Sequence, residues 1–335
     1  GILDLFLRLG AIQIFTAASD VTIQTQSYIQ SQLGLPGHTF SFISSFTDKS
    51  IYKSKLIRSG FKAVPASALL LEEKPESFYT LYRSSGLVVK PKSGSGSSGL
   101  SILRSQEETV SFKPEGNPED FIVEEYIDGT EYGGDFWVYE GEVLFYWPTQ
   151  KGCNGFKVPI SHLVLQKSYQ IRKILKPFLQ QICDVLVLEN GVYNADIIVN
   201  EETQPYIIDL SPRIGGNCIP NLFNLSLGMN EWKFMRELLL AIQPSIQKPE
   251  FVNSSGVFII GSSKKGLIKC LRLGEETPFQ HSLAEVFWKA KVGDEVEVFT
   301  EGSKHLGYVI YRASSDVELI TLQKEIESYP WFILH

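Results

Sequence analysis

The sequence of 335 residues has no excess of positive charge, since 31 lysines and arginines stand against 38 aspartates and glutamates. Without a basic stripe along which a phosphate backbone could lie, nucleic acid is not expected as a partner. Long hydrophobic runs are also missing. The longest, such as ALLL at 68–71 and VFII at 257–260, are far shorter than the roughly 18 residues needed to cross a bilayer. We therefore expect no membrane anchor.

Cysteine is scarce. The four cysteines are Cys153, Cys183, Cys218 and Cys270. They form no C-x-x-C pair and have no zinc-site spacing, so we expect reduced thiols in a cytoplasmic protein. The opening GILDLFLRLGAIQIF contains Asp4 and Arg8, where a secretory leader would have a basic start, an apolar stretch and a small-residue cleavage site. We expect this segment to be part of a folded domain, with the sequence starting inside that domain.

The composition is typical of a folded protein of two or three domains. Apolar residues make up 43% of the chain and aromatic residues 12%, which is enough for a substantial core at this length. Strand-like and helix-like segments alternate or occur in groups along the chain. The sequence therefore predicts an α/β fold, with mixed α+β lobes.

The first 47 residues predict part of one βα unit. AIQIF at 11–15 favours a short strand, the segment 21–34 favours a helix, and Pro36-Gly37 favours a turn. A doubly wound nucleotide-binding domain needs several such units of about 30 residues each. We therefore expect a partial N-terminal domain over 1–47.

Three further regions are expected: a lid lobe over 48–123, a catalytic lobe over 124–250 and a small β-rich C-terminal lobe over 251–335. The elements predicted within them are a helix at 47–60, the extended FKAVPAS at 61–67, a helix near 74–86, strands within 121–147 with a turn at 140–141, a helix at 168–186, strands at 191–200 and 205–213 joined by EETQ, and a helix near 231–242.

A loop made almost wholly of glycine and serine joins two β-rich runs at 93–99. Gly94, Gly96 and Gly99 satisfy G-x-G-x-x-G, but the following LSIL alternates like a strand, so a hairpin tip is expected rather than a dinucleotide-binding turn. Backbone NH groups of such a loop can close over phosphate, and Lys90 precedes it on the first strand. A flexible linker is the alternative.

Asp196 and Asp209 lie in apolar sequence on what we expect to be facing strands of one hairpin. A buried carboxylate needs a cation or a hydrogen-bonding partner, and two of them suit Mg²⁺ that also contacts nucleotide phosphates. Either aspartate alone would more simply be satisfied by turn NH groups. Arg213 follows directly and offers a planar fork to a phosphoryl group or carboxylate, although a lone arginine often forms only a surface ion pair.

The order of these motifs resembles the ATP-grasp superfamily, and especially its carboxylate-amine ligases, from about residue 11 to residue 335. The motifs are a lysine before a helix, a lysine before a Gly/Ser hairpin, EEYIDGTE, and Asp-x-Ser-Pro-Arg on the strand after Asp196. The resemblance implies an ATP-grasp fold with a hinged Gly-rich lid. Beside the expected phosphate-binding lysines, Lys53 and Lys55 are expected to be solvated.

The resemblance also implies roles for individual residues. Lys49 and Lys90 would contact ATP phosphates; Ser95, Gly96, Ser97 and Ser98 would close over them; Glu124, Glu125 and Ile127 would meet adenine; Glu131 would reach the ribose; Asp196, Asp209 and Ser211 would bind the metal; and Lys90 and Arg213 would act in catalysis. One departure is that Asp209-Leu-Ser211 replaces the family's usual Glu-x-Asn. Because Mg²⁺ requires near-ideal octahedral geometry, the number of metal ions stays open, and Mn²⁺ is an alternative to Mg²⁺.

The implied activity is ATP-dependent joining of a small-molecule carboxylate to an amine through an acyl phosphate. Lys151, Asn154, Gly215 and Asn217 are candidates for substrate contact, with an ordinary surface connection as the alternative for the first two. The same scaffold could instead phosphorylate a hydroxyl or enol, or bind nucleotide without turnover. The expected partners are ATP, the acid and the amine; a homodimer is left open.

Overall fold

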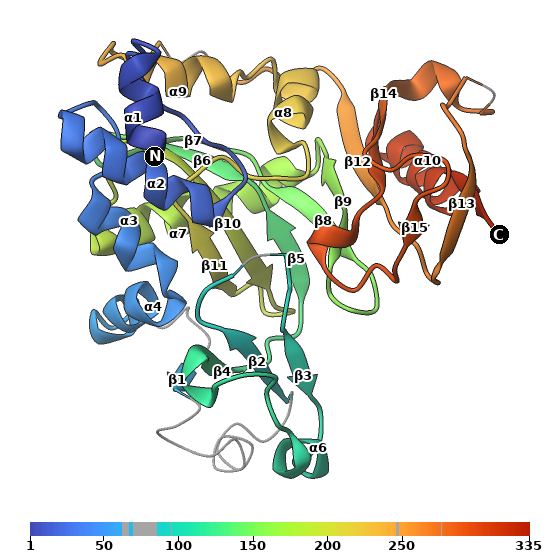
Figure 1. Ribbon diagram of the computed structural model, residues 1–335, viewed down its shortest axis with the longest axis horizontal. Coiled ribbons are helices and arrows are strands. Elements are labelled where there is room, and N and C mark those ends of the chain that lie inside the picture. Colours follow the sequence, from blue (N-terminus) through green and yellow to red (C-terminus); the bar gives the residue numbers. More distant parts are fainter. Residues whose placement is uncertain (62–66, 70–85, 95, 246–247, 276) are drawn as a thin grey trace.

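The computed structural model describes residues 1–61, 67–69, 86–94, 96–245, 248–275 and 277–335. The helix expected near 74–86 and the extended segment before it lie almost wholly outside these ranges. Figure 1 shows a large sheet with helices on both faces, a small sheet below it, and the C-terminal elements at one side.

The α-helices in the described ranges are α1 (Ile2–Arg8), α2 (Asp20–Leu33), α3 (Phe40–Thr47), α4 (Lys49–Arg58), α6 (Gln106–Ser111), α7 (Ser168–Leu186), α8 (Ile219–Leu227), α9 (Glu231–Leu239) and α10 (Asp316–Ser328). The short 3-10 helices there are η1 (Pro118–Asp120), η2 (Gln280–Ser282) and η3 (Gly302–Lys304).

The strands in those ranges are β1 (Ser67–Leu69), β2 (Leu87–Pro91), β3 (Ser101–Leu103), β4 (Phe121–Glu125), β5 (Thr130–Gly133), β6 (Asp135–Tyr139), β7 (Glu142–Tyr146), β8 (Thr149–Cys153), β9 (Pro159–Val164), β10 (Gly191–Val199), β11 (Pro205–Ser211), β12 (Ser254–Ile260), β13 (Gly266–Leu271), β14 (Leu283–Trp288), β15 (Glu295–Val296), β16 (Gly307–Ala313) and β17 (Phe332–Leu334).

The large sheet has the order β14-β16-β12-β9-β8-β5-β10-β6-β7, with β11 pairing to β10. The C-terminal strands β12, β14 and β16 therefore continue the same sheet as the central strands, whereas β15, β13 and β17 form a separate three-stranded sheet. No helix in the part of the chain that the structure describes is both long and apolar enough to cross a membrane.

The small sheet has the order β1-β4-β2-β3 and carries the glycine-rich loop. Val88 pairs with Ile102 across β2 and β3, so the loop lies at a hairpin tip as the sequence predicts. Strand β4 pairs with β2, with Lys90 opposite Ile122. The loop and Lys90 consequently lie on one small sheet, below the large sheet in Figure 1.

Alternation along β10 decides which face of the large sheet each of its side chains points to. Tyr193, Ala195 and Ile197 belong to the core shared with α4 and α7, whereas Val192 belongs to the core shared with α8 and α9. Because successive strand residues point to opposite faces, Asp196 lies on the same face as Val192. The carboxylate is therefore kept out of the α7 core.

Several predicted elements are confirmed and one is wrong. The turn at 140–141 joins β6 to β7, and Glu140 and Gly141 both have positive φ, as a two-residue hairpin loop of type I′ requires. The strand predicted at 11–15 is wrong, since that segment is irregular. Its polar Gln13 amide instead donates to the carbonyls of Pro36 and Leu239. Helices α1, α3, α6, α8 and α10 were not predicted.

Candidate functional site

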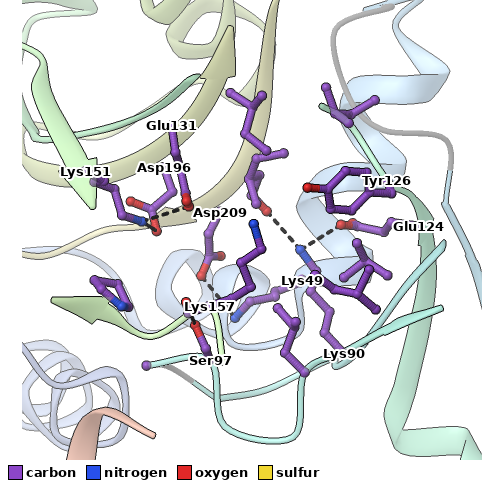
Figure 2. Close-up of a pocket in the computed structure, with 18 of the residues that line it drawn as sticks. Lys49, Lys90, Ser97, Glu124, Tyr126, Glu131, Lys151, Lys157, Asp196 and Asp209 are labelled. Atoms are coloured by element: carbon purple, nitrogen blue, oxygen red, sulfur yellow. Dashed lines mark hydrogen bonds and ion pairs between the residues drawn. The ribbon is translucent and has the colours of Figure 1, made fainter. Parts of the chain in front are cut away.

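A pocket lies between the small sheet and the face of the large sheet that carries Asp196 (Figure 2). It is lined by Lys49, Val88, Lys90, Pro91, Gly94, Gly96, Ser97, Ser98, Leu100, Ile102, Glu124, Glu125, Tyr126, Ile127, Gly129, Glu131, Lys151, Lys157, Pro159, Asp196, Ile198, Ile208 and Asp209. Most residues that the sequence nominated for nucleotide and metal binding are therefore in one place.

A buried ionic triad lies at one end of the pocket, and two of its members line the pocket. Glu124 on β4 accepts hydrogen bonds from Lys53 of α4 and from Lys90 of β2, whose Nζ lies 2.7 Å from Oε2. Lys90 also donates to the Ile208 carbonyl at 3.0 Å. Burial opposes the charged carboxylate, but the two lysines hold the pKa of Glu124 below its usual value. Glu124 thus fixes the position of the Lys90 ammonium.

The expectation that Lys53 is solvated is wrong. Its side chain is fully buried, and burial lowers the pKa of Lys53 to about 7, although Glu124 opposes the shift. Helix α4 begins after Asp48, which caps it through the Ser50 amide. This start turns Lys53 toward β4 and leaves Lys55 exposed, as expected.

Lys49 and Asp209 form the neighbouring part of the wall. The Lys49 Nζ lies 3.5 Å from Asp209 Oδ2 and donates to the Gly94 carbonyl at 2.8 Å. Tyr52 donates to the other Asp209 oxygen at 3.2 Å. Although burial works against its charge, the surrounding lysines, Lys49 first, lower the pKa of Asp209 to about 2. Asp209 is therefore ionised at neutral pH.

Asp196 and Asp209 lie on the paired strands β10 and β11, as the sequence predicts, and a register shift between Asp196 and Ile197 makes them direct partners. Lys151 of β8 lies 2.9 Å from Asp196 Oδ2 and 3.1 Å from Glu131 Oε1. Burial opposes the charge of this ammonium, but the two carboxylates raise the pKa of Lys151 above its usual range. Lys151 thus ties the predicted metal residue Asp196 to the predicted ribose residue Glu131.

The glycine-rich loop rests on the β8–β9 turn and on the C-terminal segment. The Ser97 hydroxyl donates to the Lys157 carbonyl at 2.8 Å, and the Ser98 hydroxyl donates to Glu301 at 2.9 Å. The Gly302 amide donates to the Gly96 carbonyl at 3.2 Å. Ser95 lies outside the described residues. The loop therefore covers the pocket from the side opposite the large sheet.

Apolar side chains from both sheets line the part of the pocket next to Lys49 and Lys90. Val88 and Ile102 come from the small sheet, and Ile198 and Ile208 come from the large sheet. Tyr126 directly follows β4 and precedes the predicted adenine contact Ile127, and both residues line the pocket. Facing aliphatic groups suit a flat, uncharged ring, because such a ring gains from apolar burial.

Some predicted site residues do not line this pocket. Two of them bind other side chains of the protein instead. Arg213 forms a bidentate pair with Asp20 at 2.7 and 2.9 Å, which raises the pKa of Arg213 against the effect of burial. The Asn217 amide contacts His162 at 3.3 Å. Ser211 is the register partner of Asn194, on the same strand face as the two aspartates.

Asn154, predicted for substrate contact, shapes the β8–β9 turn. Its side-chain oxygen accepts from the Phe156 and Val158 amides at 2.9 and 3.1 Å, and its amide donates to the Phe299 carbonyl at 2.8 Å. The oxygen and the nitrogen of the Asn154 side-chain amide are therefore both hydrogen-bonded within the protein. Gly215, another substrate candidate, donates its amide to Asp135 at 2.8 Å.

A buried pair of acids supports the segment that follows Arg213. Asp135 on β6 and Glu231 on α9 are both fully buried, and Glu231 also accepts from the Trp137 indole at 3.1 Å. Burial raises the pKa of Asp135 to about 6 and raises the pKa of Glu231 well above its usual value. Burial beside Asp135 therefore favours the protonated form of Glu231.

This acid pair gives a test by pH. Between about pH 4, near the unfolded pKa, and pH 6, the folded pKa of Asp135, the folded protein binds more protons than the unfolded chain. The free energy of unfolding therefore falls as pH rises through this range, and Glu231 extends the fall. We expect Glu231→Gln, which needs no proton, to flatten this slope and to gain about 1 kcal/mol at pH 8, measured by urea unfolding.

The control for that variant is Glu231→Ala. It should lose stability at every pH, because it leaves a cavity and an unpaired Trp137 N–H. An unchanged slope in Glu231→Gln would contradict the raised pKa of Glu231.

The sequence reasoning missed several residues that shape the pocket, among them Lys157 and Tyr126. Lys157 lies six residues after Lys151 in a turn, and nothing in a single sequence indicates which way a turn lysine points. The apolar residues of the pocket are common strand residues. Their only signal was their place beside predicted site residues, such as Ile208 before Asp209.

The donor set fits a magnesium ion held jointly by protein and nucleotide. No group of three or more His, Cys, Asp or Glu side chains in the described ranges could hold a metal ion. Asp196 and Asp209 nevertheless offer two adjacent carboxylates, and Mg²⁺ usually takes one or two carboxylates plus phosphates and water. Five carboxylates and four lysines line the pocket, so a polyphosphate would need added positive charge there.

A family model described as an ATP-grasp domain matches residues 47–217, just over half of the chain. No curated protein matches the chain. Among solved structures, phosphoribosylglycinamide synthetase from Anaerococcus prevotii is 22% identical, with a TM-score of 0.72 over 96% of this chain and 82% of that chain.

Two other solved structures share the fold. L-amino acid ligase from Bacillus licheniformis is 18% identical, with a TM-score of 0.80 over 99% of this chain and 83% of that chain. The biotin carboxylase domain of 2-oxoglutarate carboxylase from Hydrogenobacter thermophilus, solved with magnesium ADP, ADP and bicarbonate, is 16% identical, with a TM-score of 0.74 over 100% of this chain and 77% of that chain.

Proposed function

Because the chain belongs to the ATP-grasp family, we propose that it is an ATP-dependent ligase that activates a small-molecule carboxylate as an acyl phosphate and joins it to an amine. The main support is one arrangement: the phosphate-binding candidates Lys49 and Lys90 lie in the same pocket as the register-paired Asp196 and Asp209, under a glycine-rich loop. The names of the similar ligases agree with this reaction class.

In the proposed reaction, a carboxylate oxygen of the acid attacks the γ-phosphorus of ATP and ADP leaves. The amine nitrogen then attacks the acyl carbon and loses its proton, and inorganic phosphate leaves with the oxygen that it received. Lys49 and Lys90 offset the charge on the transferring group. The loop held by Ser97 and Ser98 keeps water from the acyl phosphate.

Asp196 and Asp209 would hold Mg²⁺, with Mn²⁺ as an alternative and Ser211 at the edge of the site. When bound, the ion would offset phosphate charge and orient the polyphosphate. Arg213, paired with Asp20, would steady the acid or its acyl phosphate from the neighbouring segment. We also propose a cytoplasmic location, in line with the four free cysteines.

An ADP-release screen over paired acids and amines tests the proposal. A ligase should release ADP and phosphate only when both substrates are present, and mass spectrometry should find the amide. A stable phosphorylated product from a single substrate would indicate a kinase instead. ATP binding without ADP release across the panel would indicate a nucleotide-binding protein without turnover.

Glu131 gives a test of the ribose assignment. We expect Glu131→Ala to raise the KM for ATP about tenfold, because one or two hydrogen bonds to hydroxyl groups are lost, while kcat changes little. Lys151 keeps Asp196 as its partner in this variant, so the pocket should stay ordered. An unchanged KM for ATP would remove Glu131 from the ribose role, and 2′-deoxy-ATP should bind both forms equally if the 2′-hydroxyl is the group contacted.

A further inference from the structure

One lysine of the pocket has a different charge environment from the others. Lys49, Lys90 and Lys151 each lie within ion-pair distance of a carboxylate. Lys157 also lines the pocket, but it takes part in none of the ion pairs found among the residues that the structure describes. Its positive charge is therefore the one in the pocket that is not already offset by a close carboxylate.

Lys157 nevertheless points into the pocket. Figure 2 shows its side chain extending toward the space between Asp209 and Tyr126. The Lys157 Nζ lies 5.8 Å from the centroid of the Tyr126 ring, and its charge helps to lower the pKa of Glu131, after Lys151 and against burial. The ammonium thus lies near both the Tyr126 ring and the Glu131 carboxylate.

The hydrogen-bonded turn at 154–158 orients Lys157 toward the pocket. The Lys157 amide donates to the Asn154 carbonyl at 3.0 Å, and the Asn154 amide donates to the Val158 carbonyl at 3.0 Å. Lys157 has a φ of +60°, which side chains other than glycine adopt at a cost in backbone energy. The Asn154 side chain ties the turn to Phe299. The strained backbone is therefore fixed from several sides.

The same residue also contacts the glycine-rich loop. Ser97 of that loop donates to the Lys157 carbonyl, so the loop lies on the turn when Lys157 faces the pocket. A ligand enclosed there would lie between the Lys157 ammonium and the loop amides. An enclosed anion gains more from a nearby cation than a hydrated one does.

We propose that Lys157 binds the polyphosphate of the nucleotide, in addition to Lys49 and Lys90, and that the Asn154–Lys157 turn positions it for this. The proposal rests on the proposed function only in that the ligand is ATP. Lys157 can take up a phosphate oxygen without losing an internal ion pair, whereas each of the other pocket lysines shares its charge with a carboxylate. Asn154 is in this account a positioning residue.

Nucleotide binding with Mg²⁺ present tests this directly. Affinities for ATP, ADP and adenosine would be measured by competition against a fluorescent ATP analogue, for wild type, Lys157→Ala and Lys157→Arg. We expect Lys157→Ala to weaken ATP and ADP about tenfold or more, the size of one charged hydrogen bond, and to leave adenosine unchanged. Lys157→Arg should restore most of the loss.

Two further variants sharpen the test. Lys324→Ala removes an exposed lysine of α10 far along the chain and should change none of the affinities. Asn154→Ala should weaken ATP and ADP in the same pattern but less, since Lys157 remains. Equal weakening of adenosine and ATP in Lys157→Ala, or unchanged ATP affinity, would overturn the proposal.

The two proposals fail in different ways. If the wild type binds ATP but ligates no acid to any amine, the ligase proposal fails while the Lys157 proposal is still decided by the ATP-to-adenosine comparison. If the wild type binds no ATP, both are overturned.

Discussion

Replacing Lys90 with alanine is expected to lower the rate of ADP formation by about 10²–10³-fold, the usual cost of losing a group aimed at developing charge, while the protein stays folded. Lys90 lies in the pocket on β2, next to the glycine-rich loop. Its removal leaves Glu124 paired with Lys53, so the buried charges remain balanced. The measurement is coupled ADP release, with urea unfolding on the same samples.

Lys53→Met is the matched control for that variant. It removes the other ammonium from the same carboxylate and leaves the Lys90–Glu124 pair, but Lys53 does not line the pocket. We expect a similar change in the free energy of unfolding and most of the activity retained. Equal losses of activity in the two variants would show that Lys90 acts only through the buried triad.

Asp196→Asn should lower ADP formation on the order of 10³-fold, because several kcal/mol of charge stabilisation are removed with the metal ligand. The amide keeps the size of the side chain but not its charge. Lys151 retains Glu131 as a partner, which protects the fold. Nucleotide binding should also need a higher Mg²⁺ concentration, and titration of Mg²⁺ at fixed ATP measures this apart from turnover.

Asp209→Asn should give the same two effects, since the two residues are register partners. Asp184→Asn, on the exposed side of α7, should give neither. If Asp196→Asn leaves both turnover and the Mg²⁺ requirement unchanged, Asp196 is only a counterion of Lys151 and the metal assignment is lost.

Charge in the pocket connects these predictions. The lining carboxylates offset the lysines, so the pocket alone does not attract a polyphosphate strongly. A divalent cation would supply the missing positive charge, together with Lys157, which has no ion-pair partner in the described part of the chain. Each variant above changes one part of that balance, which is why binding and turnover are measured separately.

The sequence by itself determined the local pattern of the site. The EETQ turn and the apolar sequence on either side of it were enough to place Asp196 and Asp209 on facing strands of one hairpin, although their direct pairing also needs the β-bulge between Asp196 and Ile197. The alternation after Gly99 was enough to make the glycine-rich loop a hairpin tip. Such features depend on neighbours a few residues apart, where backbone geometry and residue type decide the outcome.

Only the tertiary structure decided which charged groups meet. Lys53 and Lys55 look alike in sequence, yet one is buried against Glu124 and the other is exposed. Arg213 pairs with Asp20, which lies 193 residues earlier in the chain. Lys157 enters the pocket because a turn anchored on Phe299 aims it there. The partner of a long, flexible charged side chain is set by the packing of distant elements, and no local pattern encodes it.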